Sequence, residues 1–174
     1  MTARPQDQAA SRAISRMRRN HGLEHATIHL LTARRTRTLL VGRSDPSGFF
    51  LYGRVPTEAV EAAAREALVR LRRGEHHLAV HPNCGTSLLT AGTLASGAVF
   101  FSVVGGRSDR WKDHLARFPL AVLLTTLALI IAQPLGLAIQ RHVTTLADPE
   151  DLQIIEVRRI NRGRAVIHRI RTTD

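Results

Sequence analysis

The chain has a single cysteine, a single lysine and few aromatic side chains. Cys84 is the one cysteine among 174 residues, so no internal disulfide can form and the soluble parts need no oxidising compartment. Phe, Trp and Tyr make up 4%, too little for a platform on which nucleic-acid bases stack. The net charge is +11, but the arginines are spread over separate segments and no nucleic-acid-binding motif is recognisable. We therefore expect no nucleic-acid partner.

Several catalytic and targeting signals are also missing. There is no internal repeat, no glycine-rich loop that would cradle a phosphate, and no recognisable Ser, His and Asp triad. Residues 1–20 begin polar and become basic without an apolar core, so we expect no cleavable secretory signal there. The nine histidines are the remaining candidates for chemistry.

Two apolar stretches interrupt this basic background. Residues 118–139 carry no charged side chain and are long enough to cross a bilayer as one helix. Residues 87–104 are also uncharged, but the stretch is shorter and richer in small side chains. Its Ala91, Ala95 and Ala98 recur at spacings that let two membrane helices approach closely. We expect a two-helix transmembrane hairpin, with a soluble core helix as the alternative for residues 87–104.

The positive charges indicate how such a hairpin would be oriented. Of the 25 Lys and Arg residues, 14 precede the first stretch, 7 follow the second and 4 lie between them. Because cytoplasmic segments carry the excess of positive charge, we expect both termini in the cytoplasm and the chain integral to the inner (cytoplasmic) membrane. The expected partners are the lipid bilayer and its anionic headgroups. A membrane-protein partner or a second copy of the chain is a further candidate.

A helix around residue 21 would place two imidazoles and a carboxylate on one face. His21, Glu24 and His25 are three and four positions apart, close to one helical turn. The order H-x-x-E-H is that of the inverzincins, in which both histidines bind zinc and the glutamate is the general base toward water. His29 continues the stripe as a possible further ligand, with an interfacial histidine as the alternative. The alternative for the whole motif is a surface or half-buried helix in a histidine-rich chain.

A second cluster, His81-Pro-Asn-Cys84, directly precedes the apolar stretch at residue 87. Its imidazole and thiolate are three positions apart, so a turn can present both to one ion, and nitrogen with soft sulfur suits zinc. Together with His21 and His25, these two residues could close a four-coordinate site, or any three could leave a position for water. The alternatives are a small buried side chain for Cys84 and the end of a strand for His81.

The soluble part of the chain is expected to mix helices and strands. Residues 8–19 have the pattern of a basic amphipathic helix, and helix resumes or continues over 20–34, with Asn20 as a candidate cap. Strand-like runs, turn residues and a second periodic helix follow. These elements are strands at 38–41 and 49–52 joined through Asp45-Pro-Ser-Gly48, a helix at 57–73, a strand at 76–81, and a C-terminal hairpin of strands at 152–159 and 164–171.

The expected fold class is therefore α+β. A mostly cytoplasmic domain of helices and hairpins is interrupted by the two-helix transmembrane hairpin and ends in a C-terminal β-hairpin. Four regions follow along the chain: a basic amphipathic arm (1–19), a soluble α/β region with both motifs (20–86), the two-span hairpin (87–140) and the β-hairpin tail (141–174).

Both motifs resemble the signature of a known group of sequences. In the forms HGLEHATIH and HPNCGTSLL, they are similar to those of a family of small bacterial membrane proteins known only as a domain of unknown function, and this resemblance covers most of the chain. In the forms HG-x-EH and HP-x-CGTS, they also resemble the YqhQ-like family of membrane proteins, regarded as candidate metal-dependent enzymes. The matching residues are His21, Gly22, Glu24, His25, His81, Pro82, Cys84, Gly85 and Thr86. Neither resemblance implies an established reaction.

The two clusters predict a membrane-anchored zinc protein. His21, His25 and one or both of His81 and Cys84 would hold the ion, and Glu24 would act as the general base of a hydrolase. Inverzincins are soluble and larger and use a distal acidic ligand that this chain does not obviously provide, which puts proteolysis in doubt. The alternatives are a non-catalytic membrane adaptor with a structural metal, and packing histidines that hold no metal.

Overall fold

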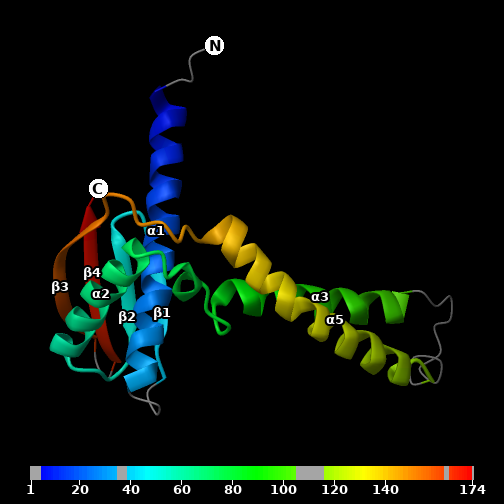
Figure 1. Cartoon of the computed structure of the whole chain (residues 1–174). Coiled ribbons are helices and arrows are strands. Elements are labelled where there is room, and N and C mark those ends of the chain that lie inside the picture. Colours follow the sequence, from blue (N-terminus) through cyan, green and yellow to red (C-terminus); the bar gives the residue numbers. More distant parts are fainter. Residues whose placement is uncertain (1–4, 35–38, 105–115, 163–164, 174) are drawn as a thin grey trace. The chain divides into compact units, whose positions relative to one another are not determined.

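The computed structural model describes residues 5–34, 39–104, 116–162 and 165–173 (Figure 1). Its contacts divide the chain into two units: the first comprises Met1–His81 and Thr144–Asp174, and the second comprises Pro82–Val143. The first unit contains helices and an antiparallel four-stranded sheet, and the second is helical. The expected α+β class is confirmed.

The sheet of the first unit is built from two hairpins. Its strands are β1 (Val41–Asp45), β2 (Gly48–Tyr52), β3 (Gln153–Arg162) and β4 (Ala165–Thr173), in the order β1-β2-β4-β3. Both predicted hairpins form, and the pairing of β2 with β4 joins them into one sheet. Of the strand predicted at 38–41, residue 38 lies outside the described residues and regular pairing begins at Val41.

Gly48 makes this junction possible. It ends the turn of the first hairpin, where it pairs with Asp45, and its φ is +136°. A Cβ atom there would lie 2.0 Å from the backbone oxygen of Ile170 in β4. Only glycine therefore allows β4 to approach β2 at this point.

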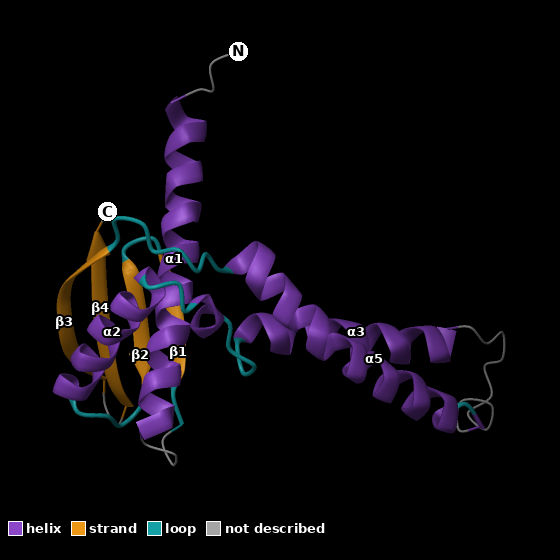
Figure 2. Cartoon of the chain, viewed as in Figure 1, coloured by secondary structure: helices purple, strands orange, loops and turns teal. Residues whose placement is uncertain are grey.

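Helices α1 (Pro5–Arg34) and α2 (Thr57–Arg72) cover one face of the sheet (Figure 2). The apolar stripe predicted on α2 is buried, and α2 packs against α1 and, in the sheet, against β3. Val60, Phe49, Leu51 and Leu23 are all fully buried in this core. The helix predicted at 57–73 is confirmed to within one residue.

The prediction that Asn20 caps a helix is wrong. Because α1 runs without a break, Asn20 lies in the interior of the helix with no exposed surface. Its Nδ2 donates to the backbone oxygen of Asp45 at 2.9 Å, and its Oδ1 accepts from Thr172 Oγ1 at 2.7 Å. The amide therefore ties α1 to the ends of β1 and β4, where strand carbonyls and side chains would otherwise lack partners.

The prediction of a strand at 76–81 is also wrong. His76–Ala79 forms a short 3-10 helix, η1, after Gly74 with its φ of +88° has ended α2. The backbone oxygens of Ala79 and Val80 accept hydrogen bonds from histidine rings on α1 rather than from a neighbouring strand. This segment satisfies its polar groups against α1, so it needs no place in the sheet.

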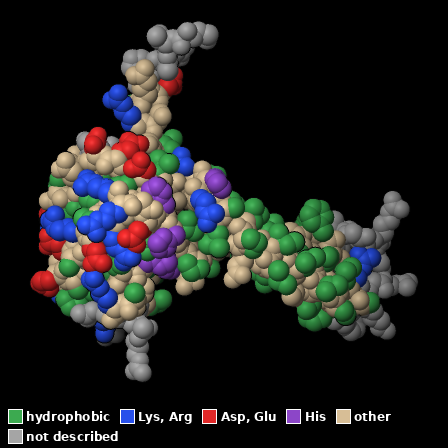
Figure 3. Space-filling view, in the orientation of Figure 1, with side chains coloured by type: hydrophobic (Ala, Val, Ile, Leu, Met, Phe, Trp, Pro, Cys, Tyr) green, Lys and Arg blue, Asp and Glu red, His purple; other side chains and the backbone are tan. Residues whose placement is uncertain are grey.

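The second unit consists mainly of α3 (Gly85–Val104) and α5 (Phe118–Ile139), the second of which continues into a π-helical turn, η2 (Gln140–Thr144). The two helices pack against each other, and Figure 3 shows hydrophobic side chains gathered over them. Among the described residues, one helical segment, Phe118–Thr144, is long and apolar enough to cross a membrane. Crossing by α3 remains a prediction.

Candidate metal centre

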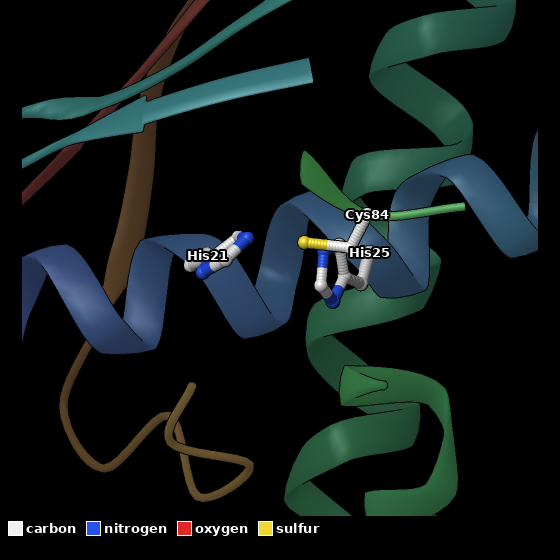
Figure 4. A group of neighbouring side chains, drawn as sticks. All are labelled: His21, His25 and Cys84. Carbon is white, nitrogen blue, oxygen red and sulfur yellow. The ribbon is translucent and has the colours of Figure 1, made fainter. Parts of the chain in front are cut away.

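His21 and His25 rise from neighbouring turns in the middle of α1 (Figure 4). Their ring centroids are 4.3 Å apart, so the four-residue spacing places both imidazoles on one face, as the sequence predicts. His25 is buried and His21 is half-buried. The pair therefore lies where a bound ion would be shielded from bulk water.

Backbone carbonyls fix the proton positions on both rings. His25 Nδ1 donates to the oxygen of Ala79 at 2.8 Å, and His21 Nδ1 donates to the oxygen of Thr144 at 2.9 Å. A carbonyl oxygen can only accept, so each neutral ring carries its proton on Nδ1 and its lone pair on Nε2. Metal-binding histidines are usually oriented in this way by a second hydrogen bond.

Cys84 brings a third candidate ligand atom to the histidine pair. One ligand atom from each of His21, His25 and Cys84 lies within 4.8 Å of the other two, and Figure 4 shows the sulfur beside the rings. Ligand atoms around a tetrahedral zinc are about 3.3–3.7 Å apart, given Zn–N of ~2.0 Å and Zn–S of ~2.3 Å. These three residues form a group that could hold a metal.

The backbone next to Cys84 presents a hydrogen-bond donor to its sulfur. The residue directly precedes α3, and its backbone oxygen accepts the bond from Leu88 N–H at 3.1 Å. The N–H of Thr86 points at the sulfur at 3.4 Å. A helix N-terminus stabilises negative charge, and the thiolate is the form that binds metals.

His81 lies next to this group but is not one of the three converging residues. Its ring centroid is 6.0 Å from that of His25 and 4.6 Å from that of His29. Burial, together with the nearby His29 and His25, lowers the pKa of His81 to about 4. The His81 ring is therefore neutral at pH 7, the protonation state that a ligand requires.

Glu24 is held by β1 and is 4% exposed. Its Oε2 accepts a hydrogen bond from Ser44 Oγ at 2.5 Å. A Cβ atom on Gly42 would lie 2.0 Å from Oε1, so glycine makes room for the carboxylate. Burial raises the pKa of Glu24, although the Ser44 hydrogen bond and the charge of His21 act in the opposite direction. The carboxylate thus occupies a fitted pocket beside His21 and is not one of the three converging residues.

Several residues around this centre have structural roles that sequence patterns alone do not reveal. Gly22 is required because a Cβ atom there would lie 2.6 Å from the backbone oxygen of Leu146, which passes directly over α1. Gly42 and Ser44 contact Glu24 from a strand that begins well after α1 ends. His29, which the four-residue stripe does indicate, donates its Nε2–H to Val80 O at 2.9 Å and so fixes the chain next to His81.

Comparison with known proteins places this arrangement in a family. The sequence profile of a domain of unknown function, DUF6391, matches residues 16–157, which include both motifs. The chain belongs to the DUF6391 family. An uncharacterised protein of Picosynechococcus sp. (strain PCC 7002) is 38% identical over 156 residues, covering 81% of this chain and 71% of that protein. No solved structure matches this DUF6391 chain.

Membership of DUF6391 confirms the expected relationship to a family whose function is unassigned. The additional resemblance to the YqhQ-like proteins stays a prediction. Neither the family description nor the Picosynechococcus relative provides a reaction, a metal or a location. The side chains of this protein are therefore the best indication of its function.

Proposed function

We propose that this protein is a membrane-anchored zinc protein whose site carries out hydrolysis. The observation that supports it most is the histidine pair of α1, because the ring centroids are 4.3 Å apart and both rings are hydrogen-bonded through Nδ1, which leaves the lone pair of each neutral ring on Nε2. The thiol of Cys84 lies within 4.8 Å of both ligand nitrogens. A set of two imidazoles and one thiolate suits zinc better than magnesium or calcium, which prefer oxygen ligands.

Three protein ligands would leave one coordination position open, as in catalytic zinc sites. When bound there, zinc would supply a water molecule of lowered pKa. Glu24 is the proposed general base, since a carboxylate whose pKa is raised by burial accepts a proton closer to neutral pH. His81 is the proposed fourth ligand in an alternative closed site, which would be structural rather than catalytic.

The anchor would be the hairpin of α3 and α5 in the inner membrane, with both termini in the cytoplasm. Large apolar side chains on both helices are strongly exposed in the second unit, among them Leu89 at 72%, Phe101 at 74% and Ile130 at 64%. Burying each in lipid would contribute roughly 1.5–3 kcal/mol. Gly136 meets Ser87 so closely that a Cβ atom would lie 2.9 Å from Ser87 Oγ, the type of small-residue contact on which membrane helices pair. Anionic headgroups, a membrane-protein partner or a second copy would be its partners.

A structural role for the metal is the second candidate function. His25 holds the carbonyl of Ala79 and His21 holds that of Thr144, so the two rings fix the segments through which the chain leaves and re-enters the first unit. A metal on the same rings would stiffen both segments. In that case the protein would be an adaptor whose basic surface binds lipid or another protein.

Metal analysis of the purified full chain tests the proposal. We expect one zinc per chain in the wild type and in His76→Ala, a control at an exposed histidine outside the group. His25→Ala and Cys84→Ser should lose the zinc. A wild type without stoichiometric zinc, or unchanged zinc in His25→Ala, would overturn the metal site.

Glu24→Gln distinguishes the two functions. The amide keeps the size of the side chain and can still accept from Ser44, so zinc content should be unchanged. A hydrolase would lose its activity toward a panel of chromogenic ester and peptide substrates. Two results would favour the adaptor. The wild-type, zinc-loaded protein would hydrolyse none of these substrates, or Glu24→Gln would hydrolyse them as well as the wild type.

A further inference from the structure

Four histidine rings of the first unit follow one another in a row, which we call the histidine row. In order, its members are His21, His25, His81 and His29. Neighbouring ring centroids along the row are 4.3, 6.0 and 4.6 Å apart. One end of the row, His21 and His25, belongs to the candidate metal centre. The other end is the pair of His81 and His29, which are not among the three converging residues.

The spacing of this second pair suits a shared metal ion. With Zn–N of ~2.0 Å and about 1.1 Å from the nitrogen to the ring centre, two imidazoles on one tetrahedral zinc have centroids roughly 5 Å apart. The centroids of His29 and His81 are 4.6 Å apart. Those of His21 and His25 are 4.3 Å apart. The second pair is therefore as well spaced for one ion as the pair in the candidate centre.

Backbone hydrogen bonds hold His81 next to both His25 and His29. His25 Nδ1 donates to Ala79 O at 2.8 Å, and His29 Nε2 donates to Val80 O at 2.9 Å. His81 directly follows these two acceptor residues in the chain, so its ring lies close to both histidines of α1. Because Nε2 is the donor, the neutral ring of His29 keeps its lone pair on Nδ1. The position of the second pair is thus set before an ion binds.

The second pair is more accessible than the ring that follows it in the row. His25 is 2% exposed, whereas His29 and His81 are both half-buried. An ion that arrives from solvent can therefore meet these two rings before it reaches His25. Two nitrogen ligands bind zinc more weakly than two nitrogens and a thiolate, because each further protein ligand replaces a water and soft sulfur suits the ion. The ion would then bind more tightly at the centre than on the second pair.

We infer that His29 and His81 form a second, weaker zinc site through which the ion reaches the candidate metal centre. This inference rests on the proposed zinc centre and assigns to the second pair the loading of that centre. Transfer requires only an exchange of ligands. His25 replaces His29 while His81 stays bound, and His21 and Cys84 then replace His81. Because each position shares one ring with the next, the ion keeps a protein ligand throughout.

Titration of the metal-free full chain with zinc chloride, in detergent and without a purification tag, tests for the second site. In competition with a chromophoric chelator, we expect a tight and a weaker equivalent in the wild type. His29→Gln keeps an amide nitrogen that can donate to Val80 O, and it should lose the weaker equivalent and retain the tight one. His81→Gln should also lose the weaker equivalent. The control His76→Gln removes an exposed imidazole of η1 outside the row and should keep both.

Cobalt measures the transfer itself, because a thiolate-to-metal charge-transfer band reports arrival at Cys84. After rapid mixing of the metal-free chain with cobalt chloride, this band should appear several-fold more slowly in His29→Gln than in the wild type. Its final intensity should be the same in both proteins, since the centre itself is unchanged. His76→Gln should load at the wild-type rate.

Retention of the weaker equivalent in His29→Gln would overturn the inference. A wild-type rate of loading in that variant would also overturn it and would show that ions enter past His21, which is half-buried too. Failure of the proposed centre gives a different result: the wild type would lack the tight equivalent and the charge-transfer band, while the weaker equivalent would still depend on His29. That result would overturn the transfer and support the second site alone. Far-UV circular dichroism verifies that each variant is folded.

Discussion

Replacing Gly42 with alanine tests whether the strand is shaped around the Glu24 carboxylate. Without that contact the change should be favourable, since glycine in a strand costs about 0.5–1 kcal/mol relative to alanine. In this structure the new Cβ would lie 2.0 Å from Glu24 Oε1 and 2.3 Å from its carboxyl carbon. Neither β1 nor the carboxylate can easily move away. Strand β1 is paired with β2, and the carboxylate accepts a hydrogen bond from Ser44.

Gly42→Ala is therefore expected to destabilise the protein rather than to stabilise it. Overpacking of a buried site costs about 1–3 kcal/mol, and displacing the carboxylate weakens its charged hydrogen bond to Ser44, worth roughly 1.5–3 kcal/mol. We expect Gly42→Ala to lower the free energy of unfolding by about 2–4 kcal/mol. Urea unfolding followed by circular dichroism in a mild detergent measures it.

A double-mutant cycle identifies the contact responsible. In a Glu24→Ala background the carboxylate is absent and the alanine at position 42 enters vacated space, so Gly42→Ala should cost less than about 0.5 kcal/mol or become stabilising. The coupling between the two positions should then exceed 1.5 kcal/mol, within the range seen for residues in contact. An equal cost in both backgrounds would refute the fitted pocket for Glu24.

Three further predictions concern Asp45, Gly22 and Cys84. Asp45→Asn should cost about 1.5–3 kcal/mol because it removes the negative charge and replaces one carboxylate oxygen with an amide nitrogen that cannot accept, so the paired hydrogen bonds from Arg169 at 2.8 and 2.9 Å can no longer both form. Burial raises the pKa of Asp45, but the hydrogen bonds from Arg169 and Ser47 and the charge of Arg169 outweigh it and hold the pKa below its ordinary value. The wild type should therefore have a larger free energy of unfolding than Asp45→Asn at pH 7, and this difference should disappear as the pH falls below about 4. Unfolding of both proteins measured from pH 7 to 3 checks this. A difference in the free energy of unfolding that stays constant with pH would contradict it. Gly22→Ala should destabilise the protein by about 1–3 kcal/mol because the Cβ atom would lie 2.6 Å from Leu146 O; a neutral effect in urea unfolding would show that this segment can move away. Cobalt-loaded protein should show a thiolate-to-metal charge-transfer band that Cys84→Ser lacks, and an unchanged spectrum would exclude sulfur ligation.

The elements that the sequence predicts correctly are those whose signals are local. The α2 helix follows from its apolar spacing, and the first hairpin follows from Asp45-Pro-Ser-Gly48. The four-residue spacing of His21 and His25 was sufficient to place both rings on one helix face. Their distance from Cys84 depends on tertiary packing, although the second motif made the combination a reasonable hypothesis.

The predictions that were wrong concern polar groups whose hydrogen-bond partners lie far away in the chain. Asn20 has the composition of a cap, but Asp45 and Thr172 provide partners that no local pattern reveals. Residues 76–81 have strand-like spacing, yet their carbonyls bond to the rings of α1. The secondary structure of such residues cannot be predicted from propensity, because tertiary hydrogen bonds determine their conformation.

The strand order has a consequence for synthesis of the chain. Because β4 is the inner neighbour of β2, the β1–β2 hairpin keeps an open edge until Ala165 and its successors have been made. At about 5–20 residues per second, translation from Tyr52 to Ala165 takes roughly 5–20 seconds. The entire second unit is synthesised during that interval. The apolar strand with Phe49 and Leu51 must be protected from aggregation while the ribosome completes a different part of the molecule.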